Sequence, residues 1–505
     1  MPLSNIRILL LIVLLGVYCC TRTTLRDQIL LHSMRQVEST ALVEPSGQLL
    51  FEGAMRGMVE KMGEELGDDY SMYIPPSSEK EFRDLLDSKL EGVGIRFDTT
   101  AATGTFKVLY PMLDSPALAA GIRCGDIVLK VDGESTENLD QASLTKKIRG
   151  EADTKVVLTV QHDGETEPAD IAIRRASIQQ NTVFGFEVNE HGGAVSAIAE
   201  HPTIGYVYIA SFGENTTKEM VQQLLKFSPK MENLILDLRN NPGGYLKAAV
   251  DVANLFVDNR GQYKEIVTTR SRDGKLKFGG QYFATDAVMF HGSIFVLIDE
   301  GSASASEILA ACLQDFGRAK ILGQRSFGKG TVQDIFELPL NNGILKLTDS
   351  SYWRPSGKNI NRIRRTSKSE NGRNAKLSEE TDDWGVMPDS GMEIKMSRNQ
   401  RMLTYFLRDL RIAIPKQTVT PMLVQYKNEL CKDTSKFLQI DFEDIPEENN
   451  ESENNETNND AIIAEPKPKN FEPEGKAPFF DPVLDKAIEL AAASGNAPER
   501  RKREL

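Results

Sequence analysis

The spacing of apolar residues changes along the chain and divides most of it into three regions. Between residues 25 and 90, apolar side chains recur at helical spacing, as at Ala54 and Met58, which predicts a helical N-terminal region. Residues 91–176 contain short alternating stretches separated by Gly and Asp turns, which predict a small strand-rich domain. Residues 177–400 contain unbroken apolar stretches between helical segments. Such stretches are typical of strands covered by helices on both faces, so we expect an α/β core there.

The N-terminus has the composition of a targeting segment. Residues 1–24 hold one early cation, Arg7, followed by an apolar run, a pattern typical of a signal peptide. No small-residue cleavage site follows the run, so an uncleaved membrane anchor is left open. Either interpretation predicts export of the chain.

The C-terminal part contains a charged stretch, an acidic stretch and a final helix. Residues 361–383 are rich in charges of both signs and predict a surface insertion in the core. A helical segment is expected at 401–440, followed at 441–478 by an acidic stretch whose composition predicts a disordered linker. Residues 479–505 predict a terminal helix, with Asp481 as its N-cap, and a basic tail. Because the linker precedes this helix, its docking on the core is left open.

The overall composition excludes some classes of protein. With 505 residues, 40% of them hydrophobic, the chain is long enough for several folded domains. Its net charge of −13 disfavours unselective binding to nucleic acid, because no excess of cations is available to replace counterions on a phosphate backbone. The five cysteines fit neither a disulfide framework nor a zinc site.

The stretch from Ile294 to Gln333 carries the clearest candidate chemistry. A buried strand is followed by a small-residue turn with Ser302, Ser304 and Ser306, and then by a helix. A serine at such a junction has its hydroxyl at the helix N-terminus, where free N–H groups and the helix dipole stabilise an oxyanion. All three serines are therefore candidate nucleophiles, and simple capping of the helix is the alternative.

A serine nucleophile needs a base, and the five histidines stand in no recognisable triad context. A lysine can serve if burial lowers its pKa from about 10.4 to about 7 or 8. Lys329 is the natural candidate, because Gly328 and Gly330 allow close packing and Phe327 offers an apolar wall. Val332 and Ile335 continue an apolar strand that would draw the ammonium group into a low dielectric. A solvated turn is the alternative interpretation of the same triplet.

A second glycine cluster ends another apolar strand, at residues 236–244. Glycines at the end of a strand expose backbone N–H groups to a ligand, so Gly244 and Ala305 are candidate donors of an oxyanion hole. A tight turn without a catalytic role is the alternative, and spacing alone favours it.

Five blocks of sequence together resemble the C-terminal processing peptidases, also called tail-specific proteases. The blocks are GSASASEI, LGxxSFGKGTVQ, LDLRNNPGG, LTDSSYWRPSG and WGVMPD. The resemblance implies that Ser304 is the nucleophile, Lys329 the general base and Gln333 the residue that orients the lysine. It also implies Gly244 and Ala305 as the two oxyanion donors.

The resemblance implies a fold as well. The expected architecture is a multidomain α/β protein with a crotonase/ClpP-like protease core, an inserted mainly-β PDZ domain and a helical N-terminal region. EGVGI at residues 91–95 resembles the carboxylate-binding loop of a PDZ domain. Val93, Gly94 and Ile95 would then hold a terminal carboxylate while the substrate adds as a strand to the sheet edge.

These features predict an exported serine endopeptidase that recognises protein substrates by their C-terminal tails and uses no metal or organic cofactor. The expected location is the periplasm or the outer face of the membrane, with attachment through the N-terminus and oligomerisation left open. One alternative is a non-catalytic PDZ adaptor on a protease-like scaffold. Another is a crotonase-like acyl-CoA enzyme, which would explain neither the PDZ module nor the export signal. The combination of Ser304, Lys329 and Gln333 favours the peptidase.

Overall fold

The computed structural model describes residues 24–97, 106–112, 114–162, 164–189, 193–259, 261–285, 288–362, 384–413 and 481–495. The predicted signal segment, the acidic linker, the basic tail and nearly all of the surface insertion lie outside these residues. The chain divides into two compact units, which are described separately. Unit 1 comprises Met1–Phe82 and Gln333–Asp349, and unit 2 comprises Arg83–Val332 and Ser350–Leu505.

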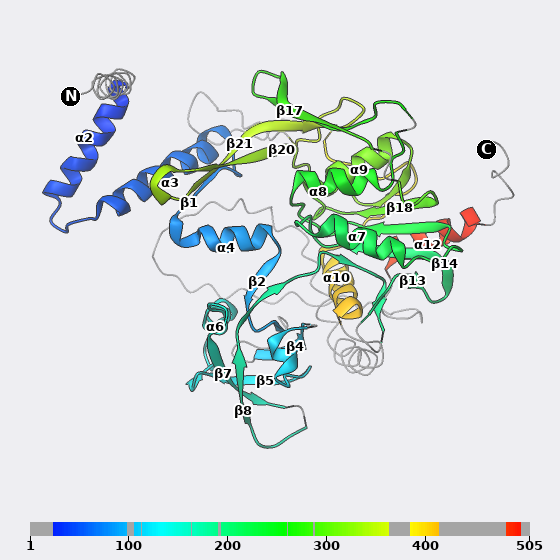
Figure 1. Cartoon of the computed structure of the whole chain (residues 1–505), viewed down its shortest axis with the longest axis horizontal. Helices are drawn as coiled ribbons and strands as arrows, with labels where there is room; N and C mark the ends of the chain where they lie inside the picture. Colours follow the sequence, from blue (N-terminus) through cyan, green and yellow to red (C-terminus); the bar gives the residue numbers. More distant parts are fainter. Residues whose placement is uncertain are drawn as a thin grey trace, which may run out of the picture. The chain divides into compact units, whose positions relative to one another are not determined.

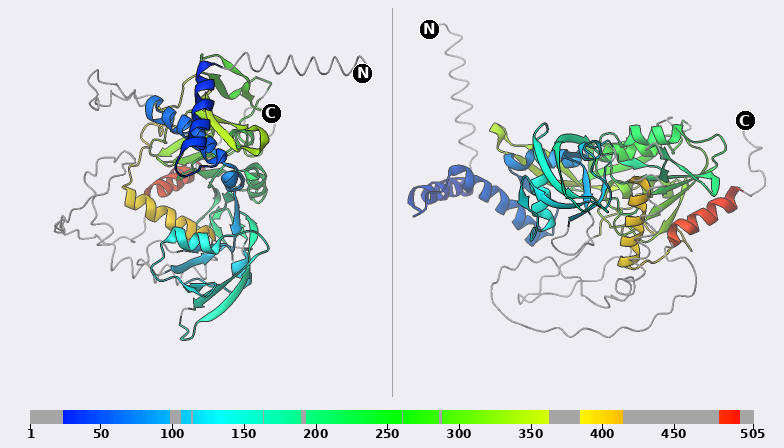
Figure 2. Two further views of the ribbon diagram at one scale, coloured as in Figure 1. Left: turned by 90° about the vertical axis from the view of Figure 1, so that its left-hand side faces the viewer. Right: turned by 90° about the horizontal axis from the view of Figure 1, so that it is seen from below.

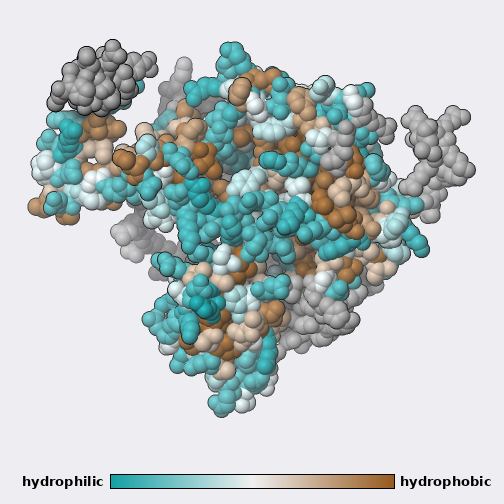
Figure 3. Space-filling view, viewed as in Figure 1, coloured by the Kyte–Doolittle hydropathy of each residue, from teal (hydrophilic) through white to brown (hydrophobic). Residues whose placement is uncertain are grey.

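Unit 1 combines helices with a short strand pair. Its elements are α2 (Leu25–Thr40), α3 (Gly47–Leu66), β1 (Met72–Ile74) and the 3-10 helix η1 (Pro339–Asn341), while α4 (Pro76–Leu86), β20 (Thr331–Glu337) and β21 (Ile344–Trp353) run from one unit into the other. β1 pairs antiparallel with β21, with Tyr73 opposite Leu345. An apolar cluster that includes Met55 and Val59 of α3 packs around Tyr73. Helix α2 buries none of its residues, so apolar side chains such as Leu25 and Ile29 are exposed (Figure 3).

The strand-rich domain of unit 2 forms a sheet around its own apolar core. The strand order is β3-β4-β5-β7-β8, with β6 paired to β5, so β3 stands at one end. The elements are β3 (Ile95–Phe97), β4 (Phe106–Pro111), α5 (Pro116–Ala119), β5 (Ile127–Val131), β6 (Glu134–Ser135), α6 (Gln141–Ile148), β7 (Lys155–Gln161) and β8 (Ala169–Arg174). In β7, Val156, Leu158 and Val160 are buried and alternate with more exposed residues. This period of two places one face of the strand in the core.

A mainly parallel sheet forms the centre of the remainder of unit 2, with the strand order β10-β14-β15-β18-β19 and β13 paired to β14. The strands are β10 (Val183–Phe184), β13 (Ala197–Ile198), β14 (His201–Ile209), β15 (Asn233–Asp237), β18 (Ser293–Ile298) and β19 (Ala319–Gly323). In β15, Leu234 and Leu236 belong to one apolar cluster and Ile235 belongs to another. Both faces of the sheet are therefore covered, which explains the unbroken apolar stretches in the sequence.

Helices from distant parts of the chain cover the two faces of this sheet. One face carries α7 (Thr216–Leu225), α8 (Leu246–Asn254) and α9 (Ala305–Asp315) (Figure 1). The other face carries α12 (Pro482–Gly495), which contacts all four parallel strands, together with residues of α10 (Arg398–Ala413) (Figure 2). Asp481 caps α12, as predicted, because its Oδ1 accepts a hydrogen bond of 3.1 Å from the N–H of Leu484. The terminal helix is therefore part of the core.

The remaining antiparallel strand pairs also lie in unit 2. They are β2 (Lys89–Gly92) with β9 (Ala176–Gln179), β11 (Glu187–Val188) with β12 (Ala194–Val195), and β16 (Glu265–Ser271) with β17 (Leu276–Phe283). The end of β21 pairs with β16, so that Trp353 lies opposite Thr268. Leu410 of α10 packs against Leu109 of the strand-rich domain. In the described part of the chain, no helix combines the length and hydrophobicity needed to cross a bilayer.

Candidate active site

Ser304 occupies a strained position between a strand and a helix. β18 ends at Ile298, a short turn follows, and α9 begins directly after Ser304. The backbone of Ser304 has φ 57° and ψ −115°, a region that residues with a side chain rarely occupy. Such strain costs about 1–3 kcal/mol and is concentrated at functional sites. Ser304 is partly exposed.

The other two candidate serines are used by the fold. Ser302 Oγ donates a hydrogen bond of 2.8 Å to the carbonyl oxygen of Leu238. Ser306 Oγ donates one of 2.9 Å to the carbonyl oxygen of Asn241. Both side chains are fully buried. Since a nucleophile must be reached by its substrate, this geometry favours Ser304 among the three.

The glycine turn after β15 packs directly against Ser304. A Cβ atom added to Gly243 would lie 2.7 Å from Cβ of Ser304 and 2.9 Å from the nitrogen of Ala305. One added to Gly244 would lie 2.2 Å from the carbonyl oxygen of Phe212. The φ angles of the two glycines, 100° and 143°, also exclude most other residues. Glycine is therefore required at both positions for close approach and for backbone conformation.

Two predicted oxyanion donors remain unused by the fold. Within the described residues, the N–H groups of Gly244 and Ala305 donate none of the backbone hydrogen bonds of the turns and caps. The N–H of Ala303 donates a bond of 2.9 Å to the carbonyl oxygen of Asn241, which ties the two turns together. Free N–H groups on two adjoining turns are the arrangement that an oxyanion hole requires.

A buried carboxylate links Ser304 to the loop that carries Lys329. Oε2 of Glu307 accepts hydrogen bonds from the N–H of Ser304, at 2.8 Å, and from the N–H of Lys329, at 2.9 Å. The two amide nitrogens are therefore separated by at most the sum of these distances, 5.7 Å. Oε1 accepts from Ser326 Oγ, at 2.5 Å, and from the N–H of Gly328, at 2.7 Å. One side chain thus fixes both segments that carry the candidate nucleophile and base.

Two opposing effects set the pKa of the Glu307 carboxyl group. Burial raises the pKa of Glu307 to about 7, although the four hydrogen bonds from Ser326, Gly328, Ser304 and Lys329 favour the ionised form. Glu307 was not singled out from the sequence, where it lies in the first turn of the predicted helix. Its spacing in Ser304-x-x-Glu307 is that of a capping box, which was the available signal.

The surroundings of Lys329 differ from those expected. Phe327 is 46% exposed, so it is not the apolar wall that was expected, and Ile335 is 40% exposed. Val332, by contrast, is half-buried against the apolar core of unit 2. Residues from the other side of the predicted insertion cover the loop instead. A Cβ at Gly328 would lie 2.7 Å from Cε3 of Trp384, and Lys329 itself is half-buried.

Further contacts hold Trp384 and the Lys329 loop in place. Arg325 and Arg362 lie over the ring of Trp384, with their guanidinium carbons 4.5 and 4.6 Å from its centroid. The hydroxyl of Tyr352 donates a hydrogen bond to the carbonyl oxygen of Lys329. Trp384 begins the block WGVMPD, but its contact with the Lys329 loop was not predicted, because the two residues are 55 positions apart and no local pattern joins them.

Gln333 lies in unit 1, whereas Ser304 and Lys329 lie in unit 2. Its side-chain amide donates a hydrogen bond of 3.2 Å to Thr348 Oγ1. Thr348 Oγ1 in turn donates one of 2.8 Å to Asp68 Oδ1. The amide is therefore held in a polar network, and its action on Lys329 stays a prediction.

The predicted carboxylate loop has the close packing of a fixed turn. The carbonyl oxygens of Val93 and Gly94 accept hydrogen bonds of 2.9 Å from the N–H groups of Ala117 and Met112. A Cβ at Gly94 would lie 2.4 Å from Cβ of Ser115. Ile95 begins β3, at the end of the strand order. No cluster of metal-ligating side chains occurs among the residues that the structure describes.

Comparison with known proteins defines the class of this chain. The model of peptidase family S41 matches residues 203–367, and a PDZ domain model matches residues 107–162. The carboxy-terminal processing protease CtpB of Bacillus subtilis is 34% identical over 310 residues, which cover 61% of this chain and 60% of that protein. The matched stretch thus spans less than two thirds of the Bacillus protein.

A second relative is matched over a larger share of its length. The carboxy-terminal-processing protease of Bartonella bacilliformis is 35% identical over 336 residues, which cover 65% of this chain and 71% of that protein. Among solved structures, the photosystem II D1 C-terminal processing protease is 26% identical, with 72% of this chain and 86% of that chain covered and a TM-score of 0.39. The chain belongs to the carboxy-terminal processing proteases, with an S41 peptidase domain and a PDZ domain.

Proposed function

We propose that this protein is an exported serine endopeptidase that recognises protein substrates by their C-termini. Ser304 Oγ attacks the scissile carbonyl carbon while Lys329 Nζ takes the hydroxyl proton. The N–H groups of Gly244 and Ala305 stabilise the oxyanion. The C–N bond then breaks, and Lys329 gives the proton to the leaving amine. Water hydrolyses the acyl-enzyme by the same proton transfers, and Gln333 orients the lysine.

One observation carries this proposal. The partly exposed Ser304 sits in a strained conformation against the Gly243–Gly244 turn, and its amide shares the carboxylate of Glu307 with the amide of Lys329. A nucleophile, two unused N–H donors and the loop of a candidate base are thereby held on adjoining turns. A non-catalytic adaptor has no need for a strained and partly exposed serine at this position.

The lysine must be neutral to act as a base. This requires its pKa to fall from about 10.4 to about 7, a change that removal of water from around the ammonium group can produce. The cover of Trp384 over Gly328 supports such a role. We expect bound substrate to complete the exclusion of water. The substitution Lys329→Arg should abolish turnover, because a guanidinium group cannot lose its proton.

Substrate selection is assigned to the PDZ domain. The N–H groups at Val93, Gly94 and Ile95 would hold the terminal carboxylate, and the substrate would extend the sheet beside β3. The substrates are then proteins or peptides with free C-termini. This assignment is supported by the match to a PDZ domain model and by the position of β3 at the end of the strand order.

Two finer parts of the proposal concern fold and location. We assign the core to the crotonase/ClpP-like architecture, because helices cover both faces of its mainly parallel sheet. We also propose that residues 1–24 direct export to the periplasm and either are cleaved or remain as a membrane anchor. Fractionation of cells, followed by N-terminal sequencing of the mature chain, tests the second part.

Labelling of the nucleophile tests the proposed chemistry. The purified full-length protein is treated with an acylating serine-directed probe and then mapped by mass spectrometry of its peptides. The label is expected on Ser304, and Ser304→Ala should lose both the label and the cleavage of a protein with an apolar C-terminal tail. Ser39→Ala, an exposed substitution on α2, is the matched control. Full cleavage by Ser304→Ala would reject the peptidase assignment, and tail binding without any label would indicate an adaptor.

A further inference from the structure

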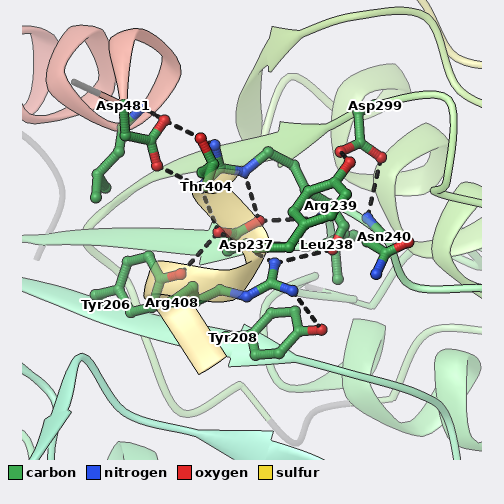
Figure 4. A network of polar contacts seen from close by, with 12 residues as sticks. Tyr206, Tyr208, Asp237, Leu238, Arg239, Asn240, Asp299, Thr404, Arg408 and Asp481 are labelled. Atoms are coloured by element: carbon green, nitrogen blue, oxygen red, sulfur yellow. Dashed lines mark hydrogen bonds and ion pairs between the residues drawn. The ribbon is translucent and has the colours of Figure 1, made fainter. Parts of the chain in front are cut away.

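A buried arginine joins the candidate catalytic region to helix α12. Arg239 directly follows β15 and is 2% exposed. Its Nε and Nη2 donate to the two oxygens of Asp237, at 3.0 and 2.7 Å. Its Nη1 and Nη2 donate to the two oxygens of Asp481, at 2.8 and 2.9 Å (Figure 4). The guanidinium group thus makes two bidentate pairs, one of them with the N-cap residue of α12.

The backbone of Arg239 is held as firmly as its side chain. Its N–H donates a hydrogen bond of 3.0 Å to Asp237 Oδ1. Its carbonyl oxygen accepts one of 3.1 Å from Nη1 of Arg408, which belongs to α10. Arg408 also donates to the hydroxyl of Tyr208, at 2.9 Å, and lies over its ring (Figure 4). Residues of α10 and α12 therefore both hold the point at which β15 becomes the glycine turn.

Asp299 extends this restraint to the turn that precedes Ser304. Its Oδ1 accepts hydrogen bonds from the N–H groups of Asn240, at 3.0 Å, and Gly301, at 2.9 Å. Its Oδ2 accepts one from the hydroxyl of Tyr405 on α10. Asn240 has a φ of 58°, in the left-handed region that asparagine adopts more readily than other residues with a side chain. The turns that lead to Gly244 and to Ser304 thus share one support with the C-terminal helices.

Loss of the Asp481 carboxylate would leave Arg239 with only one of its two bidentate partners. A buried arginine that loses one partner retains unsatisfied N–H groups in a low dielectric, and it relieves that cost by moving toward water. Movement of Arg239 displaces Asn240 and with it the turn that carries Gly243 and Gly244. The N–H group of Gly244 would then no longer lie at the position that Ser304 requires.

We propose that Asp481 is a positioning residue for the turn that carries Gly243 and Gly244. It acts through Arg239, so that α12 is a required part of the active site. This inference rests on the proposed function, because its catalytic readout is acylation of Ser304. Asp481 does not contact the reacting atoms in this scheme. It sets the position of Gly244 from the far end of the sequence.

The variant Asp481→Asn in the full-length chain separates the ion pair from the helix cap. Asparagine is as good an N-cap as aspartate, so α12 keeps its first turn, but the charge that pairs with Arg239 is lost. The expected result is a kcat and a rate of Ser304 labelling that are about 10- to 100-fold lower, with KM unchanged within about twofold. Glu489→Gln, on an exposed position of the same helix, should change neither value.

Hydrogen exchange supplies a readout independent of catalysis. In Asp481→Asn, the peptide that contains residues 239–244 should exchange faster, while protection of α12 stays that of the wild type. If labelling and exchange of the turn are unchanged, the inference is wrong. If α12 itself loses protection and activity returns in Asp481→Glu only as far as thermal stability does, the role is structural and the inference is also wrong. Failure to label Ser304 in the wild type would reject the proposed function first, and this inference with it.

Discussion

The N–H groups of Ser304 and Lys329 donate to the same oxygen atom of Glu307, although the two residues are 25 positions apart in the sequence. A serine and a lysine become a catalytic pair only if their backbones are held in a constant relation. Here a single carboxylate provides that relation. The candidate nucleophile and the candidate base therefore cannot be displaced independently of Glu307.

Shortening this side chain should disable the enzyme. Glu307→Asp keeps the charge but withdraws the carboxylate by one methylene group, so it can no longer reach both amides. We expect kcat to fall about 100-fold or more, since misplacement of a reacting group by about 1 Å has an effect of this size. Steady-state kinetics on a tailed protein substrate measures the change. Normal turnover by Glu307→Asp would show that the shared carboxylate is not needed to align the pair.

The raised pKa of Glu307 predicts a pH-dependent stability. Burial raises its pKa to about 7, so the folded form binds the proton more tightly than the unfolded form does. The stabilisation from this group is complete below the unfolded pKa of about 4.3 and is lost as the pH rises to about 7. The stability lost on Glu307→Gln should therefore be smaller at pH 8 than at pH 5, by up to about 3 kcal/mol.

Urea unfolding of both proteins at the two pH values measures this difference. Glu489→Gln is the matched control, because its side chain is exposed on α12, and its effect on the free energy of unfolding should be nearly the same at pH 5 and pH 8. An effect of Glu307→Gln that grows with pH would contradict the expected direction of the pKa shift.

A methyl group at Gly243 should disrupt the packing of the glycine turn against Ser304. In Gly243→Ala the new Cβ would lie 2.7 Å from Cβ of Ser304, and the φ of 100° would be strained. Since neither backbone can move far in a packed core, we expect cleavage and Ser304 labelling to fall about 100-fold. Gly57→Ala on α3 meets no atom within 4 Å and should have no such effect. Labelling kinetics of the two variants gives the comparison.

The carboxylate loop predicts a dependence on the free C-terminus. Amidation of a peptide substrate should raise KM with little change in kcat, because the proposed mechanism assigns recognition of the terminal charge to the PDZ domain and not to the scissile bond. In Gly94→Ala the added Cβ would lie 2.4 Å from Cβ of Ser115, so the loop must shift. This variant should no longer distinguish the amidated from the free peptide. Equal KM values for both peptides in the wild type would remove the loop from the mechanism.

Local sequence patterns were sufficient to predict the strands and the helix around the candidate active site. The strands at β14, β15 and β18 and the helix after Ser304 follow from unbroken apolar stretches and from a small-residue turn, features that depend on neighbouring residues only. The glycine turn was recognisable for the same reason. Choosing among Ser302, Ser304 and Ser306 from geometry required the structure, because the hydrogen-bond partners of Ser302 and Ser306 come from the turn that follows β15, about 65 positions earlier in the sequence.

Contacts between distant segments could not be read from the sequence. Arg239 and Asp481 are 242 positions apart, and an ion pair at such a separation leaves no periodic signal. The error at Phe327 has a related cause. Its apolar character suggested a buried wall, but the cover of the Lys329 loop is Trp384, and Phe327 is left exposed. Burial of a single residue depends on the tertiary partners that arrive, not on its own hydrophobicity.

The order in which the chain is synthesised gives the position of α12 a further meaning. Four strands of the central sheet leave the ribosome long before α12, so the face formed by Tyr206, Ile235 and Leu297 lacks this helix until residues 482–495 have been made. Arg239 lacks its second carboxylate for the same period. A nascent chain that has not yet reached α12 consequently has an unfinished core, and in the proposed scheme its glycine turn lacks the support that acylation of Ser304 requires.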